Sequence, residues 1–129
     1  TPPYLKRVSL IDTRSEITSY GFSKAQTLDI YLDYPKANGI EMATRTMNPE
    51  IIVCDEIGTM EEASAILAVQ NTGVPLIATA HAVSVTELLS RTTIKLLHDA
   101  KVFSTYVGIR RGRGKGYIFS FTRYEDVNL

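Results

Sequence analysis

The sequence contains a single cysteine, no tryptophan and no hydrophobic run long enough to cross a bilayer. Cys54 has no second cysteine to pair with, so a reduced, intracellular setting is the default expectation. No signal-peptide pattern is visible. We therefore expect a cytoplasmic protein that would reach a membrane only peripherally, through partner proteins.

The sequence also lacks a net charge, because 14 Lys and Arg residues balance 14 Asp and Glu residues. No overall electrostatic field favours nucleic acid or an anionic membrane, so we expect no nucleic-acid partner. The hydrophobic content of 44% is ordinary for a globular protein. A chain of 129 residues suits a single domain over residues 1–129.

The most informative stretch is a short apolar run that ends in two acids. Residues 51–54 are apolar, mostly β-branched and too few for a helix, which predicts a buried strand. Asp55 and Glu56 follow at once. This pattern has the form of a Walker B motif, in which the aspartate holds Mg²⁺ and the glutamate polarises the attacking water. A buried strand followed by a polar capping turn explains the stretch equally well on its own.

Hydrophobic periodicity and capping residues divide the rest of the chain into short elements. Thr59 with Glu62, and Ser84 with Glu87, have the spacing of helix N-terminal caps. The expected strands are residues 6–11, 27–34, 51–54, 74–80, 102–109 and 117–123. The expected helices are residues 35–47, 59–70, 84–89 and 92–100. The last two strands flank a basic, glycine-rich tip at residues 110–116 and therefore predict a hairpin.

This order of elements predicts an α/β fold with a mostly parallel sheet, flanking helices and a C-terminal antiparallel hairpin. Three of the expected strands end at polar residues: Asp12, Asp55 with Glu56, and His81. Right-handed crossovers would bring these strand ends to one edge of the sheet. We therefore expect these residues, with Glu16, to lie close together.

Hydrolysis of a phosphoanhydride needs the residue types gathered there. Asp55 suits Mg²⁺ as a hard oxygen ligand, and Glu56 or Glu16 would sit near the water. The candidates for contacting the γ-phosphate are His81, Arg14 and Arg45. A phosphate-binding Walker A sequence is absent. The only glycine cluster, residues 112–116, has neither its spacing nor a following helix.

From Val8 onward the sequence resembles the stage III sporulation protein AA family, relatives of the ATPases of type II and type IV secretion. The matching stretches are residues 10–17, 33–58, 71–82 and the closing strand pair. The resemblance implies a RecA-like P-loop NTPase core, hydrolysis of ATP with Mg²⁺, and a hexameric ring. It also implies a role beside membrane-associated proteins of a sporulation or secretion complex.

The resemblance also assigns roles to residues. LIDTRSEI is similar to the aspartate box of secretion ATPases, with Asp12 and Arg14 near the nucleotide and Glu16 as a water-activating carboxylate. IIVCDEIG resembles their Walker B and ATAHA their histidine box, which makes His81 a γ-phosphate sensor. Arg45 falls near where a nucleotide-proximal arginine is expected.

In that family the Walker A precedes the LIDTRSEI strand, and it is absent here. The chain therefore resembles the C-terminal part of the motor domain, truncated on its N-terminal side. We expect ATP to bind this piece weakly or not at all.

Two alternatives to a Mg²⁺-dependent ATPase motor remain open. The first is a non-catalytic assembly module, or a degenerate ATPase, that makes subunit contacts through the tip at residues 110–115. The second is a receiver-like or Toprim-like Mg²⁺ domain built on Asp12, Asp55 and Glu56. Each residue also has a structural interpretation, as a turn cap, a strand-end histidine or a surface ion pair.

Overall fold

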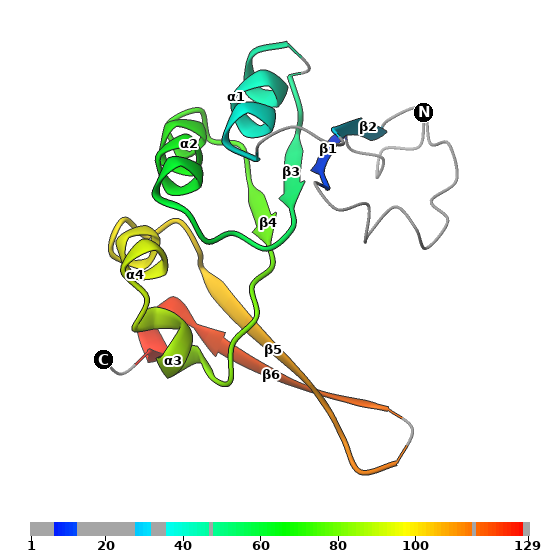
Figure 1. Ribbon diagram of the computed structural model, residues 1–129, viewed down its shortest axis with the longest axis vertical. Helices are drawn as coiled ribbons and strands as arrows, with labels where there is room; N and C mark the ends of the chain where they lie inside the picture. Colours follow the sequence, from blue (N-terminus) through cyan, green and yellow to red (C-terminus); the bar gives the residue numbers. More distant parts are fainter. Residues whose placement is uncertain (1–6, 13–27, 32–35, 47, 115, 128–129) are drawn as a thin grey trace. The chain divides into compact units, whose positions relative to one another are not determined.

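The computed structural model describes residues 7–12, 28–31, 36–46, 48–114 and 116–127 (Figure 1). The chain forms two compact units, residues 1–80 (unit 1) and residues 81–129 (unit 2). The single domain expected over residues 1–129 stays a prediction beside this division. Among the described residues, no helix has the length and apolar character that a bilayer crossing needs.

Unit 1 contains a four-stranded sheet in the order β2-β1-β3-β4, and every neighbouring pair is parallel. Its helices, α1 and α2, connect successive strands, as parallel pairing requires. The parallel α/β arrangement predicted from the sequence is therefore confirmed. The elements are β1 (Val8–Ile11), β2 (Leu28–Tyr31), α1 (Lys36–Thr46), β3 (Ile51–Cys54), α2 (Met60–Gln70) and β4 (Leu76–Ala78).

One face of this sheet is covered by α1 and α2, which pack against each other (Figure 1). Ile52 and Cys54 alternate with less buried residues along β3 and are fully buried. Gly39 lets α1 approach the sheet, since a Cβ at this position would lie 3.2 Å from Ile11 Cγ2. The buried apolar residues of unit 1 are Leu10, Ile11, Ile40, Ala43, Ile52, Cys54, Ile57, Ala63, Ala65, Ile66 and Val69.

Helix α2 begins and ends as its sequence predicts. The Thr59 hydroxyl accepts a hydrogen bond from the Glu62 N–H at 3.2 Å, and the Glu62 carboxylate accepts one from the Thr59 N–H at 3.2 Å. This reciprocal pair satisfies donors that a helix start otherwise leaves unpaired. Past the end of α2, Gly73 takes a φ of 78°, a left-handed conformation that favours glycine.

Strand β4 is shorter and more exposed than its apolar sequence suggests. A strand was expected over residues 74–80, but only Leu76–Ala78 pairs with β3. At the start of β4, Pro75 has no N–H to donate, although its carbonyl accepts from the Ile52 N–H at 3.0 Å. At the end, the Thr79 N–H donates to the Cys54 carbonyl at 3.3 Å, whereas the Thr79 carbonyl accepts from the Ile57 N–H at 3.0 Å, beyond the end of β3. Ile77 is 56% exposed, in keeping with the edge position of β4 in the described sheet.

Unit 2 joins two short helices to a two-stranded antiparallel hairpin. Its elements are α3 (Val85–Leu89), α4 (Thr92–Asp99), β5 (Thr105–Arg111), β6 (Tyr117–Arg123) and a short 3-10 helix, Tyr124–Asp126. The predicted hairpin is confirmed, but its first strand starts at Thr105, and not at residue 102. Arg110 and Arg111 pair with Ile118 and Tyr117, so they belong to β5 and not to the tip.

The buried end of the hairpin is fixed to α4 by an aromatic cluster. His98 Nδ1 lies 2.6 Å from the Tyr106 hydroxyl, and the His98 ring stacks on Tyr124 with ring centroids 4.5 Å apart. Both His98 and Tyr106 are buried. Burial raises the pKa of Tyr106 to about 12, and nearby Tyr124 and Asp99 add to the shift.

Candidate functional site

Two buried aspartates lie next to each other at the carboxyl end of the parallel sheet. Ile11 is the register partner of Cys54, so Asp12 and Asp55 are the next residues on adjacent strands. The Asp55 N–H donates to the Ile11 carbonyl at 3.2 Å, which keeps the two chains together past the strand ends. Asp12 is 0% exposed and Asp55 4%. The predicted neighbourhood of these two acids is present.

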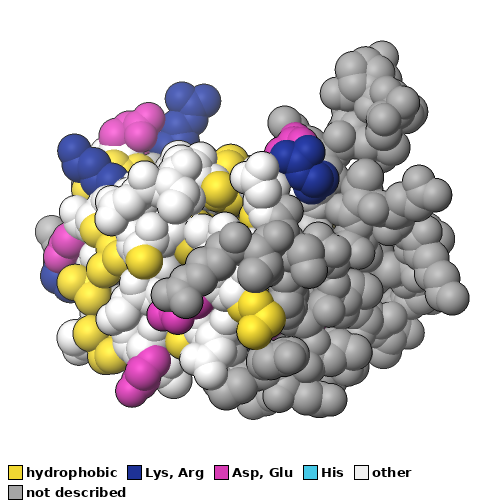
Figure 2. Space-filling view, turned by 90° about the horizontal axis from the view of Figure 1, so that it is seen from above, with side chains coloured by type: hydrophobic (Ala, Val, Ile, Leu, Met, Phe, Trp, Pro, Cys, Tyr) yellow, Lys and Arg dark blue, Asp and Glu magenta, His cyan; other side chains and the backbone are white. Residues whose placement is uncertain are grey.

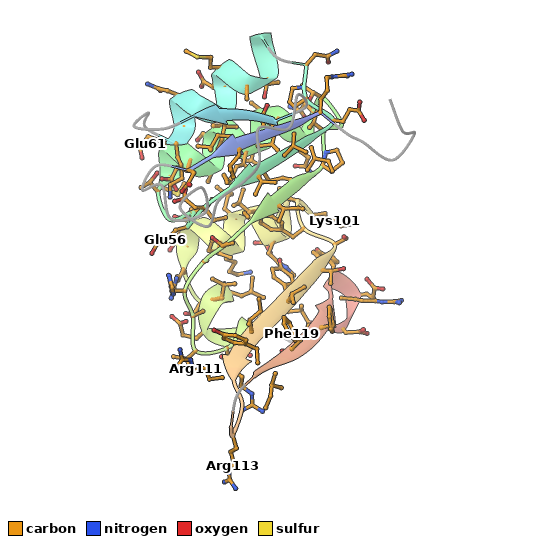
Figure 3. The ribbon with its side chains drawn as sticks, turned by 90° about the vertical axis from the view of Figure 1, so that its right-hand side faces the viewer. Glu56, Glu61, Lys101, Arg111, Arg113 and Phe119 are labelled. Carbon is orange, nitrogen blue, oxygen red and sulfur yellow. The ribbon has the colours of Figure 1, made fainter. Side chains whose placement is uncertain are left out.

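Glu56 follows with a strained main chain. Its φ of 38° is in the left-handed region, which costs a non-glycine residue roughly 1–2 kcal/mol. The Glu56 N–H donates to Thr79 Oγ1 at 2.8 Å, and the next N–H, of Ile57, donates to the Thr79 carbonyl at 3.0 Å. Thr79 thus fixes the chain immediately after the two strand-end acids. Figure 3 shows Glu56 at the edge of unit 1 that also carries Glu61, in the first turn of α2.

A lysine from α1 contacts the same turn. Lys36 Nζ donates to the Glu56 carbonyl and lies 3.7 Å from Glu62 Oε1. Both side chains are mostly buried, at 11% and 12% exposed. The other oxygen of this carboxylate, Glu62 Oε2, accepts from the Gly58 N–H at 2.7 Å. One network therefore links the start of α1, the turn after β3 and the cap of α2.

Burial and these charges also act on the neighbouring thiol. Burial raises the pKa of Cys54 to about 12; the Lys36 ammonium opposes the shift, and the Asp55 and Glu62 carboxylates add to it. A thiol in this state is protonated at neutral pH and is a poor nucleophile. Cys54 therefore contributes to core packing.

The remaining predicted site residues belong to unit 2 or have side chains outside the described part of the chain. His81 is the first residue of unit 2, follows β4 after Thr79 and Ala80, and is exposed. Arg45 lies in the last turn of α1, and its side chain is outside the description. Arg14 and Glu16 fall at residues 13–27, outside the described residues. Their convergence with Asp55 stays a prediction.

Lys36 and Thr79 were missed by the sequence reasoning, although both hold the turn that carries Glu56. Lys36 looks like an ordinary basic residue near a helix start, and Thr79 like one more position in an apolar strand. Their contacts join residues 20 and 23 positions apart in the sequence. A spacing motif does not encode such contacts, because the helix and strand must first pack together.

The paired aspartates fit a hard cation such as Mg²⁺. Among the described residues no group of three or more His, Cys, Asp or Glu side chains is placed to hold a metal. Mg²⁺ is usually bound by one or two carboxylates together with substrate phosphates and water, so a full protein cage is unnecessary. Asp12 and Asp55 supply the right donor type at the edge where α/β sheets bind ligands.

The glycine cluster of the hairpin is not a phosphate cradle. Gly112 follows β5, and its N–H donates to the Gly116 carbonyl at 3.1 Å, which closes the turn before β6. A phosphate-binding loop would instead lead into a helix and point its N–H groups at the ligand. This geometry agrees with the prediction from the sequence that residues 112–116 are not a Walker A motif.

Comparison with known proteins decides the family. A profile of the family described as "Sporulation stage III, protein AA" matches residues 4–125. The chain belongs to this family. The stage III sporulation protein AA of Bacillus subtilis (strain 168) is 34% identical over 117 residues, which cover 87% of this chain and 38% of the relative.

One further relative and one solved structure are also similar to this chain. The protein SEEDLING PLASTID DEVELOPMENT 1 of Arabidopsis thaliana is 30% identical over 98 residues, 71% of this chain and 14% of that protein. Among solved structures, the ATPase DotB of Legionella pneumophila matches with a TM-score of 0.66 at 15% identity, over 96% of this chain and 38% of DotB. This structural similarity confirms the RecA-like α/β fold class predicted for this chain.

Proposed function

We propose that this chain is part of an ATP-hydrolysing motor domain that serves a sporulation-associated complex. The observation that carries the proposal is the pair of buried aspartates at the ends of β1 and β3, followed directly by Glu56 in a fixed turn. The fold shared with the ATPase DotB supports it. The chain spans 38% of its Bacillus subtilis relative, so the activity belongs to the full-length protein.

In this proposal each residue of the edge has one task. Asp55, helped by Asp12, holds Mg²⁺, which when bound neutralises negative charge on the phosphate oxygens of ATP. Glu56 orients the attacking water and accepts its proton, with Glu16 as the other candidate carboxylate. His81, Arg14 and Arg45 contact the phosphates and balance the charge that develops there.

A magnesium titration tests the metal-binding part of this proposal. ATP hydrolysis by the full-length protein is measured across Mg²⁺ concentrations for wild type and for Asp55→Asn. Because the amide removes a charged metal ligand, we expect the half-activating Mg²⁺ concentration to rise about 10-fold or more. The control is Asp99→Asn, which alters an exposed acid paired with Lys95 on α4. An Asp55→Asn curve that overlays wild type would exclude Asp55 as the ligand.

The exposed face of the hairpin favours a second function, assembly into a ring through contacts between subunits. Directly opposite residues of β5 and β6 share a face, so Val107 with Phe121 and Ile109 with Phe119 form an apolar ladder. All four side chains are at least half exposed, and Phe121 is 73% exposed. Arg111, on the same face, and Arg113, at the tip, add positive charge beside it (Figure 3).

Adjoining exposed apolar side chains of this kind are typical of an interaction site. On the face that Figure 2 shows, Lys and Arg side chains lie among Asp and Glu side chains over the described residues. We propose that the ladder contacts another copy of the full-length protein in a hexamer, within a membrane-associated complex.

Mass measurement by light scattering tests the assembly proposal. We expect Phe119→Ser combined with Phe121→Ser to reduce the mass of the full-length assembly, because the ladder loses its two aromatic side chains. The control is Val83→Ser, which alters an apolar side chain that is 95% exposed outside the hairpin. An unchanged mass in the double variant would argue against this surface.

A further inference from the structure

We propose that Lys36 is a positioning residue for Glu56 in ATP hydrolysis. The proposal rests on the function proposed above. Lys36 lies at the first position of α1 and donates a hydrogen bond from Nζ to the Glu56 carbonyl. It thus acts on the main chain of the residue whose carboxylate is the proposed general base, and it does so from a different element.

The main chain of Glu56 requires such support. A φ of 38° is disfavoured for a side chain with a Cβ, so it persists only where the surroundings fix it. Three hydrogen bonds do this: Thr79 Oγ1 accepts from the Glu56 N–H, the Thr79 carbonyl accepts from the Ile57 N–H, and Lys36 donates to the Glu56 carbonyl. This conformation fixes the direction of the Cα–Cβ bond, from which the Glu56 side chain extends.

Lys36 is the part of this support that also carries charge. Its ammonium lies 3.7 Å from Glu62 Oε1, while Glu62 Oε2 accepts from the N–H groups of Gly58 and Thr59. The Glu62 carboxylate thereby holds the residues that follow Glu56, and Lys36 compensates its charge in a mostly buried place. Loss of the ammonium would leave both the Glu56 carbonyl and Glu62 without this donor, and would loosen the turn on both sides.

Steady-state kinetics of the full-length protein separate positioning from binding. We expect Lys36→Met to lower kcat about 10-fold or more, because small misplacements of a reacting group are costly. KM for ATP should stay within about twofold, since nucleotide contacts are unchanged. Lys36→Arg keeps donors and charge and should recover most of the rate. Lys95→Met, which removes an exposed lysine paired with Asp99, is the matched control.

A double variant identifies the route of the effect. If Lys36 acts through Glu56, adding Lys36→Met to Glu56→Gln should cause little further loss, because the carboxylate to be positioned is already absent. Full multiplication of the two losses would overturn the proposal, as would a Lys36→Met enzyme with the wild-type kcat.

Hydrogen exchange supplies a readout that does not depend on activity. We expect Lys36→Met to speed amide exchange in the peptide covering residues 55–59, while Lys95→Met leaves it unchanged. Thermal unfolding identifies any variant that is globally unfolded. If Lys36→Met is unfolded, Lys36→Gln, which removes the ammonium but keeps a polar side chain, takes its place with the same expected faster exchange, and Lys36→Arg should exchange near the wild-type rate. Unchanged exchange at residues 55–59 in Lys36→Met would overturn the role of Lys36. Absence of ATP hydrolysis in the wild type would count against the proposed function instead, with the exchange result still deciding about Lys36.

Discussion

At the scale of single residues, Cys54 shows how the core at the end of β3 controls chemistry. The thiol is fully buried, and its pKa is raised to about 12. We therefore expect no alkylation of the native protein by iodoacetamide at pH 8, and complete alkylation after denaturation. Mass spectrometry of the Cys54 peptide measures both. Labelling at the same rate in both states would mean that β3 is not a buried strand.

Gly39 is a second residue whose role depends on packing. A Cβ there would lie 3.2 Å from Ile11 Cγ2, tighter than ordinary contact. We expect Gly39→Val to lower the free energy of unfolding by about 1–3 kcal/mol, because overfilling a packed core forces its neighbours to move. Urea unfolding measures the change.

Asn38→Ala, one position earlier on the exposed side of α1, is the matched control for Gly39→Val. It should be neutral or slightly stabilising, since alanine is the better helix former. A Gly39→Val protein as stable as wild type would show that α1 does not pack closely on β1.

Residue-level reasoning from the sequence could find the acids of the site but not the contacts that hold them. Asp12 and Asp55 are predictable, because each ends an apolar run and parallel strands end at a common edge. The support of Glu56 by Lys36 and Thr79 is not predictable in this way. These contacts depend on where α1 and β4 come to lie, and one of them uses a main-chain carbonyl, which has no sequence signature.

At the scale of elements, the sequence predicts helix starts correctly from local capping residues, but it does not predict the strand ends that depend on pairing. The caps at Thr59 and Ser84 are confirmed, since a cap depends on residues only three positions apart. Strand ends depend on the partner strand instead. β4 stops at Ala78, because the carbonyl of Thr79 bonds to Ile57 beyond the end of β3, although its N–H still donates to Cys54. β5 runs through Arg111 because Tyr117 pairs with it.

The attachment of the hairpin to α4 gives unit 2 a sensitivity to high pH. The pKa of Tyr106 is raised to about 12 in the folded protein, whereas an ordinary tyrosine titrates near about 10. Between these values the unfolded chain releases a proton that the folded chain retains. The contribution of Tyr106 to the free energy of unfolding is therefore fully present below about pH 10 and is lost as the pH rises toward 12.

We expect Tyr106→Phe to remove this part of the pH dependence. Phenylalanine has no proton to release, although its loss of the contact with His98 Nδ1 lowers stability at every pH. Unfolding midpoints from pH 8 to pH 11, followed by circular dichroism, test the difference. Tyr117→Phe is the control, because Tyr117 is 61% exposed. Parallel curves for wild type and Tyr106→Phe would contradict this account.

At the scale of the whole molecule, the fold class and family were predictable because they depend on the order and spacing of many short elements. The sequence order of strands and helices is retained in the structure, and the family profile covers residues 4–125. The convergence of Glu16, Arg14 and His81 on the acidic edge is a matter of three-dimensional placement. It stays a prediction that belongs to the full-length protein.

The central proposal is that, in the full-length protein, the acidic edge of the sheet hydrolyses ATP, with Glu56 acting on the water. The most direct measurement is steady-state ATP turnover by the full-length protein, its Glu56→Gln variant and a Glu61→Gln control at the exposed start of α2. We expect Glu56→Gln to lose about 100-fold or more in kcat, in the range for a general base, and Glu61→Gln to match wild type. Undiminished hydrolysis by Glu56→Gln would contradict the account.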